Sequence, residues 1–350
     1  MNILKYFSLN LFLALFIACG GDNSPTALFE IQLEGNKNVF QENQVVNVSI
    51  ENKKNKTIDG IIYSIDGNEL PIKDGSISLN TDQLGDKTLK AVIDYEDTSA
   101  EISKNIKIFA AKAPEIYTYK IINEYPHDSK AYTQGLEFHN DTLYESTGKK
   151  GRSSLRKVDY KTGKILKQVD LDASYFGEGI TILNDKIYML TWQSGTGFIY
   201  DLNDLKRLDS FKYGQSKEGW GLTNDSKNLY KSDGTERIWI LNPETLAEEG
   251  SIETVTNKSI NDSANELEYV DGKIYANVYQ KPSVMIIDAH SGAIEGVINF
   301  GGLSEKVTHH ESWSDTDNVL NGIAYHSDRQ TFFVTGKEWD KIFEVTIHKK

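Results

Sequence analysis

An internal repeat of about 45 residues constrains this chain more than any other feature of its sequence. Five segments share one pattern, in which an anchor residue precedes alternating apolar residues, a turn and an aromatic residue. The anchors are Gly135, Gly179, Gly221, Glu266 and Gly322, so successive anchors lie 44, 42, 45 and 56 residues apart. A period of this length, with about four short strands per repeat, is typical of the blades of a β-propeller. Five repeats therefore predict an all-β domain of five blades over residues 115–350.

The last repeat is too short for a complete blade. Only 28 residues follow Gly322, which is enough for three strands. Residues 117–122, Tyr-Thr-Tyr-Lys-Ile-Ile, precede the first repeat and have the composition of a strand. We expect this segment to supply the fourth strand of the last blade, because closing the ring removes exposed sheet edges.

Residues 26–112 differ in character from the repeats. They contain no His, Trp or Cys, and their apolar residues alternate with polar ones in short runs separated by turn residues. Such runs predict β-strands over residues 46–50, 61–65, 77–79, 89–93 and 102–109. About seven runs in fewer than ninety residues favour an immunoglobulin-like β-sandwich. Since nothing in this segment suggests chemistry, we expect a spacer domain that precedes the propeller.

The N-terminal residues predict export and lipid attachment. An apolar run over residues 9–18 follows Lys5, and at about ten residues it is too short to span a bilayer but suits a secretory signal peptide. The only cysteine of the chain, Cys19, ends the sequence Phe-Ile-Ala-Cys, which resembles a bacterial lipobox. We expect a signal peptide over residues 1–18, an acylated Cys19 and a tether over residues 19–25. The product would be an exported lipoprotein anchored on a membrane, periplasmic or at the cell surface; a signal peptide cut elsewhere is the alternative.

Charge and cysteine content exclude several classes of protein. Lys and Arg number 38 against 51 Asp and Glu, a net charge of −13, which argues against a nucleic-acid binder with a basic surface. A single cysteine excludes an intrachain disulfide and a Cys-based zinc site. His309-His310-Glu311 has the residue types of a metal site but not the helical i, i+4 histidine pair. We therefore expect neither a metal nor a cofactor.

Positions that are equivalent in the repeat but chemically unlike one another are the candidates for a functional site, because the fold explains the shared positions. One such set precedes the anchors: Gln134, Glu178, Trp220, Asn265 and Asn321. The other lies four residues after each repeated aromatic residue: Gly148, Trp192, Gly234, Tyr279 and Lys337. The innermost strand of a blade lines the central channel of a propeller. We expect both sets to lie near the axis.

Together the two sets have the composition of a small-ligand site, in which a few polar groups converge among aromatic rings. The alternative is that these residues only fill a narrow channel. Glu178 favours a functional site, because a lone carboxyl among rings loses solvation. That loss raises the carboxyl pKa toward the range useful for proton transfer.

Eight short motifs occur along the repeats: YTQGL at 132–136, ESTG at 145–148, YFGEG at 175–179, GWGL at 219–222, SDGT at 232–235, NELEY at 265–269, LNGIA at 320–324 and VTGK at 334–337. In order and spacing they resemble the plant-type glutaminyl cyclases, or glutaminyl-peptide cyclotransferases. Those enzymes are five-bladed propellers unrelated to the zinc-dependent animal enzymes. The resemblance covers about residues 125–349 and not the first domain.

The resemblance implies an enzyme that converts the N-terminal glutaminyl residue of a peptide to pyroglutamate and releases ammonia, without a metal. It implies that Glu178 carries the proton from the α-amine to the departing nitrogen. It also implies that polar residues hold the substrate between aromatic walls, with Tyr279 standing where the family usually has tryptophan. The ring and the resemblance together give these candidates for substrate binding: Gln134, Phe176, Trp192, Trp220, Asn265, Tyr279, Asn321 and Lys337.

Two other functions remain open. One is a propeller lipoprotein that binds peptides or other ligands without turnover. Such a binder has no need to keep both Glu178 and Lys337, and this chain has both. The other is a metal-dependent lactonase, which would require several carboxylates on the axis, whereas only Glu178 occupies the ring.

Overall fold

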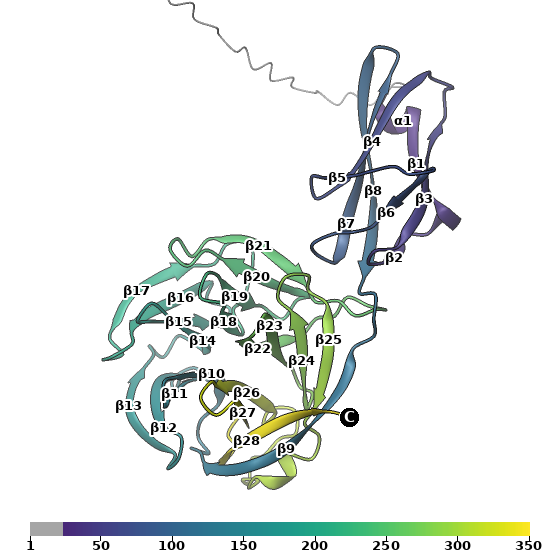
Figure 1. Cartoon of the computed structure of the whole chain (residues 1–350). Coiled ribbons are helices and arrows are strands. Elements are labelled where there is room, and N and C mark those ends of the chain that lie inside the picture. The colour runs from purple at the N-terminus through teal and green to yellow at the C-terminus, as the bar shows by residue number, and fades with distance from the viewer. Residues whose placement is uncertain (1–23) are drawn as a thin grey trace, which may run out of the picture. The chain divides into compact units, whose positions relative to one another are not determined.

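The computed structural model describes residues 24–350, which divide into two compact units (Figure 1). One unit comprises residues 24–38, 45–78 and 88–105, and the other comprises residues 39–44, 79–87 and 106–350. The expected signal peptide, Cys19 and most of the expected tether lie outside the described residues. No helix within residues 24–350 has the length and apolar character that crossing a membrane requires.

The segment before the repeats is built from β-strands in two sheets, with strand orders β1-β3-β6 and β2-β8-β7-β4-β5. A one-turn helix α1 (Pro25–Leu28) and a 3-10 turn η1 (Glu34–Asn36) accompany the strands. The strands are β1 (Phe29–Leu33), β2 (Val39–Gln41), β3 (Val45–Asn52), β4 (Ile58–Ile65), β5 (Asn68–Leu70), β6 (Ser76–Ser78), β7 (Gly85–Tyr95) and β8 (Thr98–Phe109). In β7, buried Leu89, Ala91 and Ile93 alternate with more exposed residues, so one face of the strand covers a core. All five runs predicted from the sequence overlap these strands, whereas the immunoglobulin-like assignment stays a prediction.

Each repeat folds into an antiparallel blade, as predicted (Figure 1). The first blade consists of β10 (Thr133–His139), β11 (Thr142–Thr147), β12 (Ser154–Asp159) and β13 (Lys164–Asp170). The second consists of β14 (Gly177–Leu183), β15 (Lys186–Thr191), β16 (Thr196–Asp201) and β17 (Arg207–Lys212). The third consists of β18 (Leu222–Asn224), β19 (Leu229–Ser232), β20 (Arg237–Leu241) and β21 (Glu248–Glu253). The fourth consists of β22 (Ala264–Val270), β23 (Lys273–Val278), β24 (Ser283–Asp288) and β25 (Ile294–Asn299).

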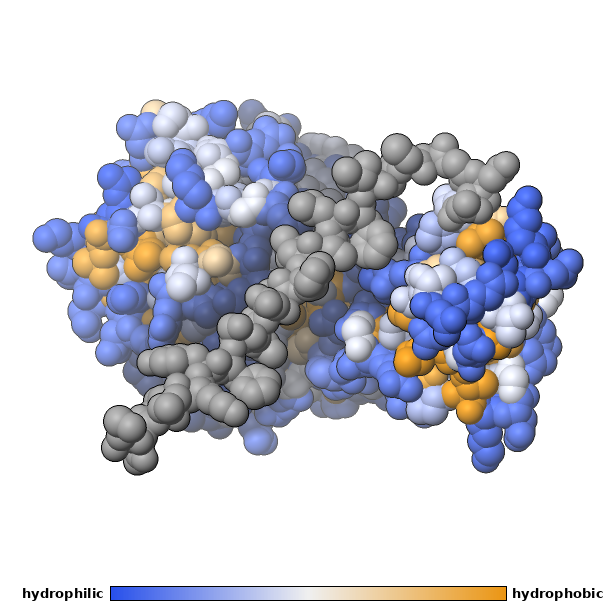
Figure 2. All heavy atoms as spheres, turned by 90° about the horizontal axis from the view of Figure 1, so that it is seen from above, coloured by the Kyte–Doolittle hydropathy of each residue, from blue (hydrophilic) through white to orange (hydrophobic). Residues whose placement is uncertain are grey.

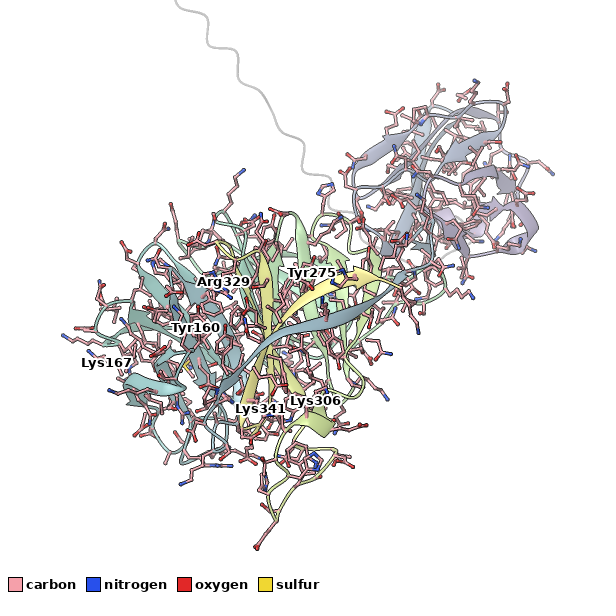
Figure 3. All side chains as sticks on the ribbon, turned by 60° about the horizontal axis from the view of Figure 1, so that its bottom comes forward. Tyr160, Lys167, Tyr275, Lys306, Arg329 and Lys341 are labelled. Carbon is pink, nitrogen blue, oxygen red and sulfur yellow. The ribbon has the colours of Figure 1, made fainter. Side chains whose placement is uncertain are left out.

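The fifth blade is completed from the other end of the repeat region. It consists of β26 (Leu320–His326), β27 (Thr331–Gly336), β28 (Lys341–Lys349) and β9 (Glu115–Pro126), after a 3-10 turn η2 (Ser304–Lys306). β9 pairs antiparallel with β28, and Figures 1 and 3 show the two strands side by side. β9 also pairs in parallel with β25 and so joins the last two blades into one eight-stranded sheet. The prediction that residues 117–122 supply the missing strand is confirmed.

The glycine anchors allow the inner strands of neighbouring blades to approach closely. A Cβ atom on Gly179 would lie 2.6 Å from the backbone oxygen of Trp220, and one on Gly221 would lie 2.0 Å from the backbone oxygen of Asn265. Both distances are shorter than any van der Waals contact, so a side chain would push the strands apart. The repeated glycines thus serve packing around the axis.

Three further carboxyls lie on the inner strands and accept hydrogen bonds from backbone N–H groups of other blades; Glu266 and Glu268 are buried, and Glu137 is half-buried. Glu266, the anchor of the fourth repeat, accepts hydrogen bonds from the backbone N–H groups of Leu136 at 3.1 Å and Ile323 at 2.8 Å. Glu137 and Glu268 each accept one from another inner strand. Burial raises the pKa of all three carboxyls, that of Glu137 to about 8. From the sequence, Glu178 was the one carboxylate expected near the axis. The structure adds these three on the inner strands, where they accept hydrogen bonds from backbone N–H groups.

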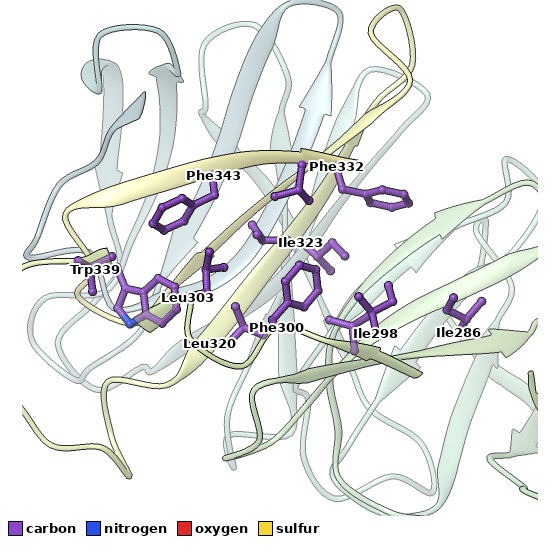
Figure 4. Packing of buried hydrophobic residues seen from close by; sticks show 13 residues of the cluster. Ile286, Ile298, Phe300, Leu303, Leu320, Ile323, Phe332, Trp339 and Phe343 are labelled. Atoms are coloured by element: carbon purple, nitrogen blue, oxygen red, sulfur yellow. The ribbon is translucent and has the colours of Figure 1, made fainter. Parts of the chain in front are cut away.

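Hydrophobic clusters fill the spaces between blades. The cluster in Figure 4 packs side chains of the fourth and fifth blades around Phe300, Phe343 and Trp339. Trp339 is 1% exposed, its Nε1 donates to the backbone oxygen of Asn318 at 2.9 Å, and its ring packs where Gly336 leaves room for it. The core therefore supports the chain next to Lys337. By contrast, most of the surface seen in Figure 2 is hydrophilic, with small hydrophobic groups between the polar residues.

Candidate active site

A cavity of about 270 Å³ gathers eight of the nine candidate site residues. Its lining consists of Tyr132, Gln134, Lys149, Phe176, Glu178, Trp192, Trp220, Asn265, Tyr279, Asp317 and Lys337. These residues come from all five repeats. Of the candidates, Asn321 does not belong to the lining.

β-Bulges at one repeat position place the polar residues of the first set. The pairing between the first two strands shifts register at the same point in four blades: between Thr133 and Gly135, Gly177 and Ile180, Ala264 and Leu267, and Leu320 and Ile323. The irregular residues include Gln134, Glu178, Asn265 and Asn321. Because a bulge bends the strand and re-aims its side chains, the irregularity in these four blades takes one variable side chain out of the regular alternation of its strand.

Glu178 is a buried carboxyl with one unoccupied oxygen. Its side chain is 4% exposed, and within residues 24–350 its Oε2 has no hydrogen-bond partner. Burial raises the pKa of Glu178 well above its usual range, while Lys337 and a hydrogen bond from Gln134 lower it and Glu218 raises it. A buried oxygen without a partner costs free energy, which a polar group of a bound substrate can recover.

Asn321 lies behind the cavity wall and orients Gln134. Its Nδ2 donates to the backbone oxygen of Thr133 at 2.9 Å and to Oε1 of Gln134 at 3.1 Å. With its oxygen occupied in this way, the amide of Gln134 presents its N–H donors to Glu178. The structure thus gives Asn321 a supporting place instead of the substrate contact that the sequence suggested.

Lys337 brings a positive charge to the same cavity. It is 3% exposed, and its Nζ lies 4.9 Å from the ring centroid of Tyr132 and 5.4 Å from that of Tyr279. Burial lowers the pKa of Lys337 to about 8, although Glu178 and Asp317 act to raise it. The cation and the carboxyl of Glu178 therefore interact within one cavity, where burial lowers the pKa of the lysine and raises that of the carboxyl.

Two pairs of rings form the apolar walls. Phe176 and Trp192 meet edge to face with their centroids 5.5 Å apart, and Trp220 and Tyr279 do so at 5.2 Å. The glycines of the second set make room for these rings. A Cβ on Gly148 would lie 2.3 Å from Phe176, and one on Gly234 would lie 2.5 Å from Trp220.

Tyr132, Lys149 and Asp317 line the cavity but were not predicted as site residues. The hydroxyl of Tyr132 donates to Asp317 Oδ1 at 2.5 Å, and Lys149 donates to Oδ2 at 2.8 Å, with its Nζ 4.0 Å from the Tyr132 ring centroid. Asp317 belongs to the insertion that lengthens the last repeat spacing to 56 residues, which was the one signal for it. Lys149 lies in the connection between β11 and β12.

The exposed His309 side chain makes its contacts within its own loop. The His309 ring stacks on Trp313 with centroids 3.9 Å apart, and its Nε2 contacts the backbone oxygen of Ser304 at 2.9 Å. Within the described part of the chain, no three His, Cys, Asp or Glu side chains are grouped as metal ligands.

Known proteins share this fold and these motifs. The family model for glutamine cyclotransferase matches residues 90–347. A glutaminyl-peptide cyclotransferase of Arabidopsis thaliana is 40% identical over 232 residues, which is 65% of this chain and 71% of the relative. The crystal structure of the glutaminyl cyclase of Myxococcus xanthus superimposes with a TM-score of 0.63 at 32% identity, covering 68% of this chain and 99% of the other. The family model begins at residue 90 and so reaches into the segment that the motifs had left out. These matches confirm the family that the eight motifs indicated, and the chain belongs to the glutamine cyclotransferase family.

Proposed function

We propose that this chain is a glutaminyl-peptide cyclotransferase, an acyltransferase that converts N-terminal glutamine of peptides to pyroglutamate without a metal or cofactor. The observation that carries the proposal is the buried Glu178 carboxyl, which has an unoccupied oxygen and lies in an aromatic cavity together with the Lys337 cation. The family to which the chain belongs supports the reaction.

The substrate itself supplies the nucleophile. The neutral α-amine nitrogen attacks the carbon of the side-chain amide, a carbon–nitrogen bond forms, and the five-membered lactam closes. An α-amine with a pKa of about 7.7–8.0 is partly neutral near pH 7, so it needs little activation. The difficult step is the departure of the amide nitrogen as ammonia.

Glu178 can move the required proton. As a carboxylate it accepts a proton from the amine that has attacked, and as a carboxylic acid it donates that proton to the departing nitrogen. One proton is transferred, one carbon–nitrogen bond forms and one breaks, so the reaction is balanced without a co-reactant. Burial raises the pKa of Glu178, so its carboxylate is a stronger base toward the attacking amine than an exposed carboxylate would be.

The tetrahedral intermediate carries negative charge on the former amide oxygen. Lys337 and the side-chain amide of Asn265 line the cavity and can donate hydrogen bonds to that oxygen. The rings of Phe176, Trp192 and Trp220 can enclose the apolar part of the glutamine side chain and exclude water from the reaction.

The purified chain is expected to release ammonia from a peptide that begins with glutamine and not from the same peptide beginning with asparagine, whose cyclisation would require a four-membered ring. Coupled detection of ammonia measures the rate, and the rate is expected to be the same in the presence of EDTA. Absence of release from a folded sample would favour the ligand-binding alternative. Inhibition by EDTA that added zinc or calcium reverses would contradict the metal-free mechanism.

We also propose that the chain is an exported lipoprotein, because its one cysteine ends a lipobox-like sequence after an apolar run. Labelled palmitate fed to producing cells is expected to mark the wild-type protein and not the Cys19→Ser variant. Equal labelling of both proteins would overturn the assignment of Cys19.

A further inference from the structure

We propose that Glu218 is a positioning residue that holds the two tryptophan walls of the cavity in one arrangement. The inference rests on the proposed function to the extent that these walls contact the glutamine side chain. Glu218 itself does not belong to the cavity lining.

A single carboxylate oxygen bridges the two indoles. Oε2 of Glu218 accepts hydrogen bonds from Nε1 of Trp192 at 2.7 Å and from Nε1 of Trp220 at 2.8 Å. Its other oxygen, Oε1, accepts one from Nε2 of Gln193 at 3.0 Å. Trp192 follows β15 of the second blade and Trp220 precedes β18 of the third. The carboxylate therefore ties two blades together at the cavity wall.

The backbone that carries Glu218 is anchored by a buried ion pair. Lys231, which is fully buried, donates to Glu248 at 3.0 Å. Glu248 in turn accepts hydrogen bonds from the backbone N–H groups of Gln215 at 2.5 Å and Ser216 at 3.0 Å. These residues lie two and three positions before Glu218, so its place is set by the core of the third blade.

A tyrosine fixes the start of the same loop. The Tyr213 hydroxyl donates to the backbone oxygen of Thr191 at 2.9 Å and accepts from its backbone N–H at 2.8 Å. Thr191 immediately precedes Trp192. Tyr213 thus links the loop that carries Glu218 to the end of the strand that precedes Trp192.

Such a bridge has a physical purpose at a cavity wall. An indole that is partly exposed can turn about its side-chain bonds, and its N–H group needs an acceptor when the ring is covered by substrate. Hydrogen bonds to a carboxylate are stronger than those to a neutral acceptor. Because one oxygen holds both rings, their relative orientation is fixed before a substrate arrives, which lowers the entropy lost on binding.

The charge of Glu218 also acts on the acid–base group. Burial is the main cause of the raised pKa of Glu178, and the negative charge of Glu218 raises it further. The other groups that act on Glu178 are Lys337 and Gln134, which lower its pKa, and the neutral hydroxyls of Tyr132 and Tyr213 also lie near enough to interact with it. Removing the charge at position 218 should therefore lower the pKa of Glu178.

Two variants separate the geometric effect from the electrostatic one. Glu218→Gln keeps an oxygen acceptor but loses the charge, so the limb of the pH–kcat profile that belongs to Glu178 is expected to move to lower pH, while KM changes little. Glu218→Leu loses the acceptor as well, and KM for a glutamine-initiated peptide is expected to rise about tenfold or more, with a smaller change in kcat. Glu236→Gln is the matched control, since it removes a carboxylate close to Glu218 while the N–H groups of both indoles donate to Glu218, and it is expected to change neither quantity.

Tryptophan fluorescence gives a readout that does not depend on turnover. Acrylamide quenching is expected to increase in Glu218→Leu relative to wild type and Glu236→Gln, because the freed indoles become more mobile and accessible. This arm tests the positioning role even if wild type releases no ammonia, an outcome that would refute only the proposed function. Unchanged quenching and KM in a folded Glu218→Leu variant would overturn the inference. If that variant does not fold, Glu218→Ala takes its place, since it also removes the acceptor of both indoles, and quenching equal to that of wild type would then overturn the inference.

Discussion

Replacing Glu178 with glutamine is expected to lower kcat by a factor of about 10²–10⁴, the usual contribution of general acid–base catalysis. Glutamine has the same shape but cannot accept a proton from the attacking amine or deliver one to the departing nitrogen. KM should change less, because the aromatic walls and Lys337 remain. Ammonia release measured over a range of glutamine-peptide concentrations gives both constants.

The fold should tolerate this substitution. The backbone oxygen of Glu178 accepts its hydrogen bond from Ser146 at 2.5 Å in either case, and a neutral side chain avoids the cost of burying a carboxylate. Glu268→Gln is the matched control: Glu268 is also a buried carboxyl of raised pKa, but it accepts a backbone hydrogen bond at 2.8 Å and does not line the cavity. Near-native kcat in Glu178→Gln, or an equal loss in Glu268→Gln, would refute the role assigned to Glu178.

The architecture could be predicted from the sequence because a propeller is local. Four of the five blades are single repeats of consecutive strands, so the period of the anchors reports the number of blades directly. The exchange of β9 into the last blade was also predictable, since the shortfall after Gly322 left one strand to be supplied. Repeat alignment likewise indicated Gln134 and Glu178, because it compares positions that geometry makes equivalent.

The supporting contacts could not be predicted in this way, because a residue's repeat position does not reveal which side chains of other blades and loops it meets. Asp317 reaches the cavity from the insertion before the fifth repeat, and Glu218 reaches two indoles from the loop before the third. Asn321 is equivalent to Glu178 in the repeat, yet it turns to Gln134. The repeat gives a residue's place on its strand, and the neighbouring blade decides what its side chain contacts.

Loss of the positive charge of Lys337 is expected to lower kcat strongly. In the wild type, deprotonation of Lys337 is expected to cause the fall of activity at alkaline pH. Lys337→Met should lose a factor of about 10²–10³ in kcat, the typical effect of removing one donor that stabilises an oxyanion. In the wild type, the cation is complete below its pKa of about 8 and is lost as the pH rises through that value. The substrate amine acts in the opposite direction, because it becomes a nucleophile only as it loses its proton. A fall in kcat above pH 8 therefore points to the lysine and not to the substrate.

Arginine at position 337 separates charge from titration. Arg stays protonated at every pH of the assay, so Lys337→Arg is expected to be slower than wild type but to lose the decline above pH 8. The control is Lys341→Met, which removes a lysine on β28 that pairs with Glu124 at 2.8 Å and lies outside the cavity lining; its pH profile should match that of wild type. An alkaline decline that persists unchanged in Lys337→Arg would show that another group titrates there.

Because Lys337 also lowers the pKa of Glu178, Lys337→Met should move the limb assigned to Glu178 to higher pH, opposite to the shift expected for Glu218→Gln. Opposite shifts from the two variants would identify one carboxyl held between a cation and an anion as the group that transfers the proton.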